Sequence, residues 1–367
     1  MPSKLRESEF RDLLSQDRPL IDVRAPLEFM RGAFPASVNL PLLLDDERHE
    51  VGKQFKSAGQ DAAIILANEL VGGDNKLERL SKWKDFLKRN PSAAVYCFRG
   101  GLRSQTVQQW MIDQGIDVPL VEGGYKALRR FLLKTIETVT GQSSFMIIGG
   151  KTGSAKTHLI NALNYSIDLE GLANHRGSAF GRRILGQPTQ IDFENHLAIA
   201  LLKLPYEKPE HLFLEDESRA IGSLSLPKEF HDKMGDSPIA MLEETLEARI
   251  ETIYKDYIYS NYKDFQNQDR EAAQQNFSEF LLGSLQRIQK RLGGEKFTQL
   301  HAIMNEALTH TDPGESESLH KLWIQHLLCD YYDPMYEYQM NKKLNRVVYR
   351  GNRDEFLAWA SHLNRDS

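Results

Sequence analysis

Short apolar runs alternate with longer amphipathic stretches along the first third of the chain. Residues 20–23 and 93–96 are mainly apolar and predict strands, whereas 61–70 and 76–89 are candidates for amphipathic helices, and a further helix is predicted at 104–114. The second strand ends in a glycine-rich loop that leads into the last of these helices. This strand–loop–helix alternation predicts an α/β domain built on a parallel sheet.

A second α/β unit begins after a predicted helix at 126–139 and a short linker, rich in Gly and Ser, at 141–144. A strand at 145–148 opens this unit. Further strands are predicted at 211–214, 238–242 and 346–349, and further helices at 158–163, 243–292, 315–328 and 354–363. We therefore expect an α/β domain over 1–138, followed over 139–367 by a second α/β domain with a helical C-terminal part.

Length and charge narrow the class of protein. At about 150 residues per domain, 367 residues correspond to two domains or slightly more. The net charge of −5 excludes a uniformly basic nucleic-acid coat, although it permits a local basic patch. No apolar run reaches the ~18 residues of a transmembrane helix, and the first residues lack the hydrophobic segment of a signal peptide. We expect no membrane partner.

The chain has only two cysteines, Cys97 and Cys329, and no Cys/His spacing matches a zinc site. A disulfide framework is therefore excluded, and a reduced, cytoplasmic compartment is expected. Cys329 stands beside Leu327 and Leu328 in a predicted helix, so we expect it in an apolar core.

The loop at 97–104 is the first candidate for chemistry. A loop between a strand and a helix turns backbone N–H groups inward, which favours an anion and lowers the pKa of a thiol held there. Arg99 and Arg103 add positive charge, so Cys97 is expected to be a thiolate able to receive a chalcogen or a phosphoryl group. The Cys-x5-Arg spacing from Cys97 to Arg103 also resembles the loop of cysteine-dependent phosphatases, and spacing alone does not separate the two chemistries.

The loop at 150–157 lies between a strand and a helix, as a phosphate-binding P-loop does. Lys156 would neutralise phosphate oxygens and Thr157 would bind Mg²⁺, while Ala155 replaces the usual glycine and restricts φ. The residues expected to hold a di- or triphosphate are Gly150, Gly153, Ser154, Lys156 and Thr157. Following the strand at 212–214, an acidic run is expected to hold the same Mg²⁺ through water, as a Walker-B carboxylate does: Glu215, Asp216 and Glu217.

Two resemblances follow from these and further motifs. Residues 5–130 resemble a rhodanese domain, with Leu20-Ile21-Asp22-Val23-Arg24 before the loop at 97–104 and Glu122-Gly123-Gly124-Tyr125 after it. The strings at 175–181, 187–195, 215–222 and 331–336, in this order after a P-loop, resemble the tRNA 2-selenouridine synthase family over essentially the whole chain. Within these strings the candidates for contact with substrate or tRNA are His175, Arg176, Ser178, Gln187, Gln190 and Arg219.

The second resemblance implies a two-step reaction on the wobble 2-thiouridine of tRNA. Geranyl diphosphate would first alkylate the thiocarbonyl sulfur and release diphosphate, which is work suited to Lys156, Thr157 and Mg²⁺. Selenium from selenophosphate would then replace the geranylthio group, which the Cys97 loop could serve. RNA would bind to local basic surface, for which Arg129 and Arg130 are candidates.

Three other functions remain open from the residues alone. A P-loop kinase or ATPase with a regulatory rhodanese domain would bind ATP or GTP more tightly than a prenyl diphosphate. A Cys-x5-Arg phosphatase would hydrolyse an aryl phosphate only while Cys97 is intact. A non-catalytic RNA-binding adaptor would use neither loop, and the reactive residues in both argue against it.

Overall fold

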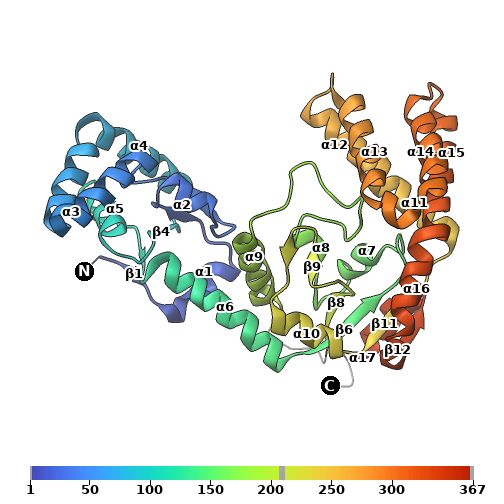
Figure 1. The fold of residues 1–367 in the computed structure, drawn as a ribbon. Coiled ribbons are helices and arrows are strands. Elements are labelled where there is room, and N and C mark those ends of the chain that lie inside the picture. Colours follow the sequence, from blue (N-terminus) through green and yellow to red (C-terminus); the bar gives the residue numbers. More distant parts are fainter. Residues whose placement is uncertain (1, 206–210, 364–367) are drawn as a thin grey trace. The chain divides into compact units, whose positions relative to one another are not determined.

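The computed structural model describes residues 2–205 and 211–363, and these form two compact units. The first unit comprises 1–139 together with 189–203, and the second comprises 140–188 and 204–367. Both are α/β units, as predicted, and each contains a five-stranded parallel sheet (Figure 1).

The sheet of the first unit has the strand order β1-β5-β4-β2-β3, and every pairing is parallel. Its strands are β1 (Lys4–Leu5), β2 (Leu20–Asp22), β3 (Ser37–Asn39), β4 (Ala94–Tyr96) and β5 (Leu120–Val121). Its helices are η1 (Glu7–Glu9), α1 (Phe10–Ser15), α2 (Pro26–Met30), α3 (Asp45–Leu70), α4 (Gly73–Arg89), α5 (Leu102–Ile112), α6 (Gly124–Gln142) and α9 (Gln190–Lys203). The residues of β4 are fully buried, so this central strand lies inside the core.

Helix α9 belongs to the first unit although 189–203 follows the P-loop in the chain and the sequence places it in the second domain. The Asp192 carboxylate accepts a hydrogen bond from the Ala33 N–H at 2.7 Å, and the Asn195 amide donates to the Ala33 carbonyl at 2.7 Å. Phe193 and Leu197 are fully buried. The sequence analysis predicts no helix at 189–203. A local sequence pattern also does not show against which unit such a helix would pack.

The sheet of the second unit has the strand order β12-β11-β6-β8-β7, again parallel throughout. Its strands are β6 (Ser144–Gly149), β7 (Ser166–Ile167), β8 (His211–Glu215), β11 (Ile239–Leu242) and β12 (Val347–Gly351), and a separate hairpin is formed by β9 (Ala220–Ile221) and β10 (Leu224–Ser225). The helices around this sheet are α7 (Lys156–Ile160), α8 (Leu169–Leu172), α10 (Lys228–Asp236) and α17 (Arg353–Leu363).

A helical part is inserted between β11 and β12, as the sequence predicts for the C-terminal region (Figure 1). It consists of α11 (Leu246–Ile253), η2 (Tyr254–Tyr259), α12 (Ser260–Gln268), α13 (Ala273–Leu292), α14 (Gly294–Thr309), α15 (Pro313–Leu327), η3 (Leu328–Tyr332), α16 (Asp333–Asn341) and η4 (Leu344–Arg346). Both η2 and η3 are π-helical, a widened form that is rare and frequently found at functional sites. They share one apolar cluster that includes Ile253, Trp323 and Tyr332.

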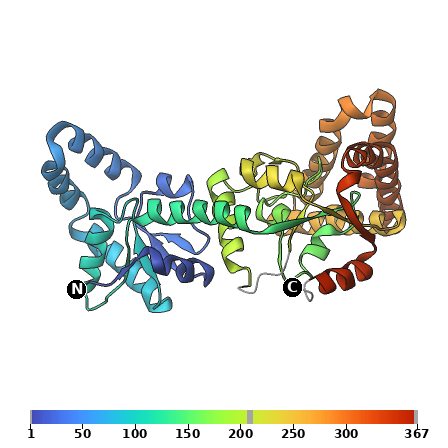
Figure 2. The same cartoon turned by 90° about the horizontal axis from the view of Figure 1, so that it is seen from below.

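Two local predictions are wrong. The linker expected at 141–144 does not exist, because α6 continues to Gln142 and β6 begins at Ser144 (Figure 2). Cys329 is exposed rather than in a core. The buried positions on this helix are Trp323, Ile324, Leu327 and Leu328, and Cys329 lies off the face that they form.

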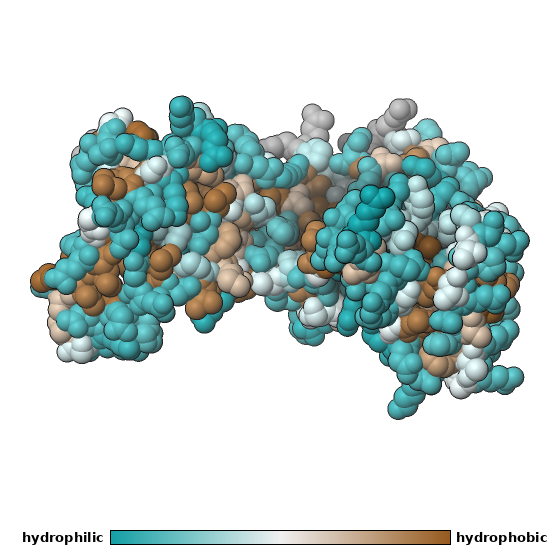
Figure 3. All heavy atoms as spheres, turned by 90° about the horizontal axis from the view of Figure 1, so that it is seen from above, coloured by the Kyte–Doolittle hydropathy of each residue, from teal (hydrophilic) through white to brown (hydrophobic). Residues whose placement is uncertain are grey.

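The face of the molecule drawn in Figure 3 is mainly hydrophilic. Figure 3 shows one face on which hydrophobic residues are scattered among polar ones. Among the described residues, no helix combines the length and the apolar character needed to cross a membrane.

Candidate functional site

The first candidate site is the loop between β4 and α5. Cys97 follows the buried strand β4 directly and is itself only 3% exposed. Its Sγ lies 3.1 Å from Ser104 Oγ, which is within hydrogen-bond distance. The loop therefore holds the thiol at the base of a strand–loop–helix turn whose helix begins directly after Gly101.

The Cys97 loop is tied to the start of α6 by backbone contacts. The Tyr125 N–H donates to the Cys97 carbonyl at 2.8 Å, and the Lys126 N–H donates to the Phe98 carbonyl at 3.1 Å. Gly124 makes this approach possible, because it has φ of +58° and a Cβ there would collide with the Cys97 carbonyl oxygen. The motif at 122–125 thus positions the reactive loop.

The two arginines of this loop have different surroundings. Arg99 is exposed. Arg103 donates through Nη1 to Glu28 Oε2 at 2.5 Å and through Nη2 to Glu28 Oε1 at 3.3 Å. Burial alone would raise the pKa of Glu28, but the hydrogen bond and charge of Arg103 lower it. The Arg103 charge is therefore already paired, which weakens the resemblance to a phosphatase loop, where the arginine must bind the phosphate.

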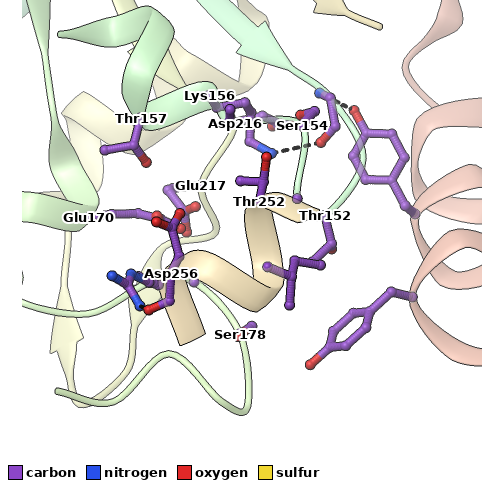
Figure 4. Close-up of a pocket in the computed structure, with 18 of the residues that line it drawn as sticks. Thr152, Ser154, Lys156, Thr157, Glu170, Ser178, Asp216, Glu217, Thr252 and Asp256 are labelled. Carbon is purple, nitrogen blue, oxygen red and sulfur yellow. Dashed lines mark hydrogen bonds between the residues drawn. The ribbon is translucent and has the colours of Figure 1, made fainter. Parts of the chain in front are cut away.

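The second candidate site is the loop between β6 and α7, which lines a pocket of about 700 Å³ (Figure 4). All five residues predicted to bind phosphate line it: Gly150, Gly153, Ser154, Lys156 and Thr157. Lys156 Nζ donates to the Gly150 carbonyl at 2.8 Å, so the ammonium group lies across the loop. Ala155 adopts a left-handed conformation with φ of +59°, the conformation that the usual glycine adopts without strain.

The phosphate loop is supported by residues of the helical part for which the sequence predicts no contact with this loop. Arg249 is 3% exposed and donates through Nε to the Thr152 carbonyl at 2.9 Å. The same guanidinium is paired with Asp333, with Nη1 2.9 Å from Oδ2. The Gly150 N–H donates to the Tyr336 hydroxyl at 2.7 Å (Figure 4). The helical part therefore holds the loop through Arg249, Asp333 and Tyr336, two of which lie in the string at 331–336.

Carboxylates face the loop from the strand β8 and from α8. Thr157 Oγ1 lies 3.3 Å from Glu215 Oε1, and Glu215 is fully buried. Figure 4 shows Glu170 and Glu217 close together on the same side of the pocket as Thr157. A Cβ at Gly177 would lie 2.7 Å from Glu170 Oε1 and 2.8 Å from Glu217 Oε1, so the glycine leaves room for both carboxylates.

These carboxylates are held in an environment that disfavours their negative charge. Burial, followed by the charge of Glu170, raises the pKa of Glu215 to about 8. Burial and the charge of Glu170 also raise the pKa of Glu217 well above its usual value. Asp216, by contrast, is paired with Lys343 at 2.8 Å. The cluster formed by Glu170, Glu215 and Glu217 is therefore short of positive charge.

These side chains fit the Mg²⁺ that the P-loop pattern implies. The Thr157 hydroxyl and the neighbouring Glu215 carboxylate are hard oxygen donors of the kind Mg²⁺ prefers, and the surplus of carboxylate is what a cation would relieve. No three His, Cys, Asp or Glu side chains within the described ranges are arranged to hold a metal by themselves. An ion here would accordingly depend on phosphate oxygens and water as further ligands.

The structure brings together only some of the other predicted contact residues. Arg176 and Ser178 line the phosphate pocket, and the Arg176 guanidinium lies 4.9 Å from the centre of the Tyr257 ring. His175 is 7% exposed, and burial lowers its pKa. The residues outside the pocket lining are His175, Gln187, Gln190 and Arg219.

Two of the residues outside the pocket lining, Gln187 and Gln190, form hydrogen bonds with other residues of the chain. The Gln187 amide donates to the Ala173 and Ile221 carbonyls at 3.1 and 2.8 Å, and its Oε1 accepts from the Ser223 N–H at 2.7 Å, so it fixes the hairpin. Gln190 lies on α9, in the first unit, and donates to Glu194 at 2.9 Å. Arg219 is exposed.

The two arginines predicted to bind RNA both lie on α6. Arg129 is paired with Glu194 and donates to Asn195 Oδ1 at 2.7 Å, so it attaches α9 to α6. Arg130 is 74% exposed in its side chain and lies 3.5 Å from Glu7. Of the two, Arg130 is the one with a side chain accessible to a ligand.

Comparisons with known proteins agree with the presence of two different domains in this order. Residues 7–130 match the model of the rhodanese-like domain, and residues 143–366 match that of the tRNA 2-selenouridine synthase AAA domain. A tRNA 2-selenouridine synthase of Marinobacter nauticus is 46% identical over 361 residues, covering 98% of this chain and 98% of the relative.

Two further relatives carry the same name. The protein of Photobacterium profundum is 48% identical, covering 95% of this chain and 96% of its own, and that of Shewanella oneidensis is 46% identical, covering 98% and 96%. Both domain models thus occur in the predicted order, and the match extends over nearly the whole chain. The chain belongs to the tRNA 2-selenouridine synthase family and is an enzyme of that type.

Proposed function

We propose that this chain converts the wobble 2-thiouridine of tRNA to 2-selenouridine through an S-geranyl intermediate, with geranyl diphosphate and selenophosphate as co-substrates. The observation that carries the proposal is the presence of two distinct strand–loop–helix turns, one holding the Cys97 thiol beside Ser104 and one holding Lys156 and Thr157 near the buried Glu215. The membership of the chain in its family supports the same reaction.

In the first step, the thiocarbonyl sulfur attacks C1 of the geranyl group, the C–O bond to diphosphate breaks, and the uridine loses its N3 proton. The Lys156 ammonium would give up its hydrogen bond to the Gly150 carbonyl and donate to a diphosphate oxygen instead. The loop amides would bind further diphosphate oxygens. Mg²⁺, bound at Thr157, would neutralise charge on the leaving diphosphate. The residues Glu170, Glu215 and Glu217 would balance the charge of that ion.

Part of the lining of the phosphate pocket is apolar or aromatic, which is compatible with a prenyl chain. Ile253, Tyr257, Tyr332, Met335 and Met340 line the phosphate pocket, and they come from the helical part. The apolar cavity that adjoins these residues, lined by Phe180, Trp323 and Leu327 among others, has a volume of only about 20 Å³, so a ten-carbon chain would lie in the larger phosphate pocket. Contact with the apolar residues of the phosphate pocket would stabilise such a chain, by about 25 cal/mol per Å² of apolar surface buried.

In the second step, selenium from selenophosphate attacks C2 of the geranylated base, and geranylthiol leaves. Water then cleaves the P–Se bond, so that phosphate and 2-selenouridine are the products. The Cys97 thiol would contact the selenium donor in this step. Gly124 and Ser104 position the loop that carries this thiol. The Glu28 carboxylate neutralises the charge of Arg103. The anionic co-substrate would therefore depend mainly on loop amides and on the exposed Arg99.

The test is mass spectrometry of nucleosides from 2-thiouridine-containing tRNA incubated with the full chain, Mg²⁺ and geranyl diphosphate. We expect a geranyl mass gain without selenophosphate and conversion to the selenium nucleoside when selenophosphate is added. An unchanged tRNA under both conditions, together with hydrolysis of ATP or GTP, would contradict the proposal and support the kinase or ATPase alternative.

A further inference from the structure

A groove in the first unit lies beside the Cys97 loop and has no role in the chemistry described above. Its volume is about 560 Å³, and it is formed by one face of α6 and by Phe98, the residue that follows Cys97. The lining residues are Phe98, Tyr125, Lys126, Arg129, Arg130, Leu133, Lys134 and Glu137. On α6 they recur at helical spacing, so they form one continuous stripe.

The charge of this groove is opposite to that of the chain. Four of its side chains are cationic and one is anionic, whereas the whole chain has a net charge of −5. Lys126 and Lys134 are exposed, and neither forms an ion pair with any residue in the described ranges. Arg129 is neutralised by Glu194, so Lys126, Arg130 and Lys134 are the cations that face solvent.

The end of the groove nearest the loop is aromatic. Phe98 is half-buried, and its ring stacks on Tyr125 with centroids 6.0 Å apart and an interplanar angle of 15°. The Arg24 guanidinium lies 3.9 Å from the centre of the Tyr125 ring, which extends the stack into the buried interior. Phe98 is therefore held in place by a ring that is itself fixed, and part of it is exposed to the groove.

Stacked aromatic rings beside a line of lysines are how proteins bind single-stranded RNA, since bases stack on the rings and phosphates contact the cations. We propose that this groove binds a single-stranded segment of tRNA, with one base stacked on Phe98 and the backbone along Lys126, Arg130 and Lys134. This inference rests on the proposed function, because it takes tRNA to be the substrate.

The location of Phe98 gives the groove a consequence for the reaction. The Lys126 N–H donates to the Phe98 carbonyl, and the Tyr125 N–H donates to the Cys97 carbonyl. A base on Phe98 would thus be held by the same backbone that positions the thiol. A nucleotide bound here would bring its neighbours along the RNA strand close to the Cys97 loop.

The experiment measures binding of an unmodified anticodon stem–loop RNA to the full chain over a series of salt concentrations. Phe98→Leu keeps apolar volume and removes the ring, so we expect roughly 5- to 100-fold weaker binding with an unchanged salt dependence. Phe98→Trp should bind as the wild type does. Lys126→Ala/Lys134→Ala should reduce the slope of log affinity against log salt by about 1.4, for two phosphate contacts with a single strand.

A matched pair of exposed lysines elsewhere in the first unit serves as the control. Lys56→Ala/Lys88→Ala removes the same charge outside the groove and should leave the slope close to its wild-type value. The inference is overturned if Phe98→Leu binds the stem–loop as tightly as the wild type, or if the control pair lowers the slope as much as the groove pair does. In the first case the groove would be available for a protein partner instead.

Mass spectrometry of tRNA treated with the same proteins separates this inference from the proposed function. A wild-type chain that modifies tRNA, with groove variants that bind RNA normally, overturns the groove alone. A wild-type chain that neither binds nor modifies tRNA overturns both.

Discussion

The two loops proposed to bind anions occupy the same position in two different sheets. The Cys97 loop follows β4, and the phosphate loop follows β6, and each of these strands is the third of five in a parallel sheet. In each unit the loop leads from the carboxyl end of the central strand into a helix. Such an edge is where ligands bind in open α/β sheets.

The loops differ in how their charges are balanced. In the first, Arg103 is paired with Glu28, and the thiol is buried beside Ser104. In the second, Lys156 is bonded only to loop carbonyls, and it faces carboxylates whose pKa values are raised by burial. In the first loop Arg103 is therefore paired and Arg99 remains exposed, whereas in the second loop a lysine lies near carboxylates whose negative charge is disfavoured.

The comparison teaches that the same strand–loop–helix topology can carry two different arrangements of charge. A nucleophilic thiol requires a preformed loop whose charges do not depend on a ligand. A diphosphate leaving group carries several charges, so its site must hold complementary charge in reserve.

The largest expected effect is a separation of the two steps by mutation. Lys156→Ala should reduce geranylation of tRNA at least 100-fold, because a leaving-group contact worth several kcal/mol is lost, and it should spare selenation of tRNA that is already geranylated. Cys97→Ser should do the reverse. Both reactions are followed by nucleoside mass spectrometry.

Cys329→Ser is the matched control for the thiol, since Cys329 is the other cysteine and is exposed. It should leave both steps unchanged. Loss of geranylation in Cys97→Ser would contradict a division of labour between the loops.

The next largest effect concerns Arg103. Arg103→Met leaves the half-buried Glu28 without its main partner, so we expect the free energy of unfolding to fall by about 2 kcal/mol. Chemical denaturation measures this, and the double substitution Arg103→Met/Glu28→Met should recover part of the loss. If Arg103→Met instead abolishes selenation without any loss of stability, the arginine serves the anion and the loops are more alike than their charges indicate.

The pH dependence of the helical part offers a third test. Burial lowers the pKa of His320 to about 4, and its Nδ1 accepts a hydrogen bond from Trp323 Nε1 at 2.9 Å. In the unfolded chain the histidine titrates near 6.5, so stability present above that pH is lost progressively as pH falls toward 4. Between pH 7 and pH 5 we expect a loss of about 2 kcal/mol from this group.

Denaturation of His320→Gln at the two pH values isolates that contribution, because glutamine keeps a hydrogen-bond acceptor and does not titrate. The variant should lose less stability on acidification than the wild type. Equal losses in the two proteins would show that His320 is not the group responsible.

The smallest effect is expected at Ala155. Its left-handed conformation costs about 1 kcal/mol, which glycine avoids, although glycine also gains freedom in the unfolded chain. Ala155→Gly should therefore raise the free energy of unfolding by less than about 1 kcal/mol, as measured by thermal unfolding. A loss of stability would mean that the methyl group makes contacts that outweigh the strain.

The elements that carry both loops could be predicted because their pattern is local. An apolar run that ends in glycines and then turns amphipathic specifies β4 and α5, or β6 and α7, without information from elsewhere in the chain. The lysine and threonine of the phosphate loop belong to the same short string. Their position in a pocket follows from it.

The remaining features depend on partners far along the chain. Arg249 and Asp333 are separated by 84 residues, and Arg103 and Glu28 by 75, so neither pair leaves a local signal. The linker was predicted from glycine and serine, but Gly141 continues α6 because helix and strand are joined almost directly. The π-helical segments likewise cannot be read from apolar spacing, which fits an ordinary helix nearly as well.

The position of α9 has a consequence for the order in which the protein is made. Because α9 belongs to the first unit and its Asn195 donates a hydrogen bond to the Ala33 carbonyl, residues 1–139 by themselves lack one helix of that unit. On the ribosome, the first unit has to wait until Lys203 has been synthesised, by which time β6 and the phosphate loop already exist. The Cys97 unit is thus completed only after the beginning of the second unit has been synthesised, and a cut in the gene between residues 139 and 140 would separate α9 from the unit to which it belongs.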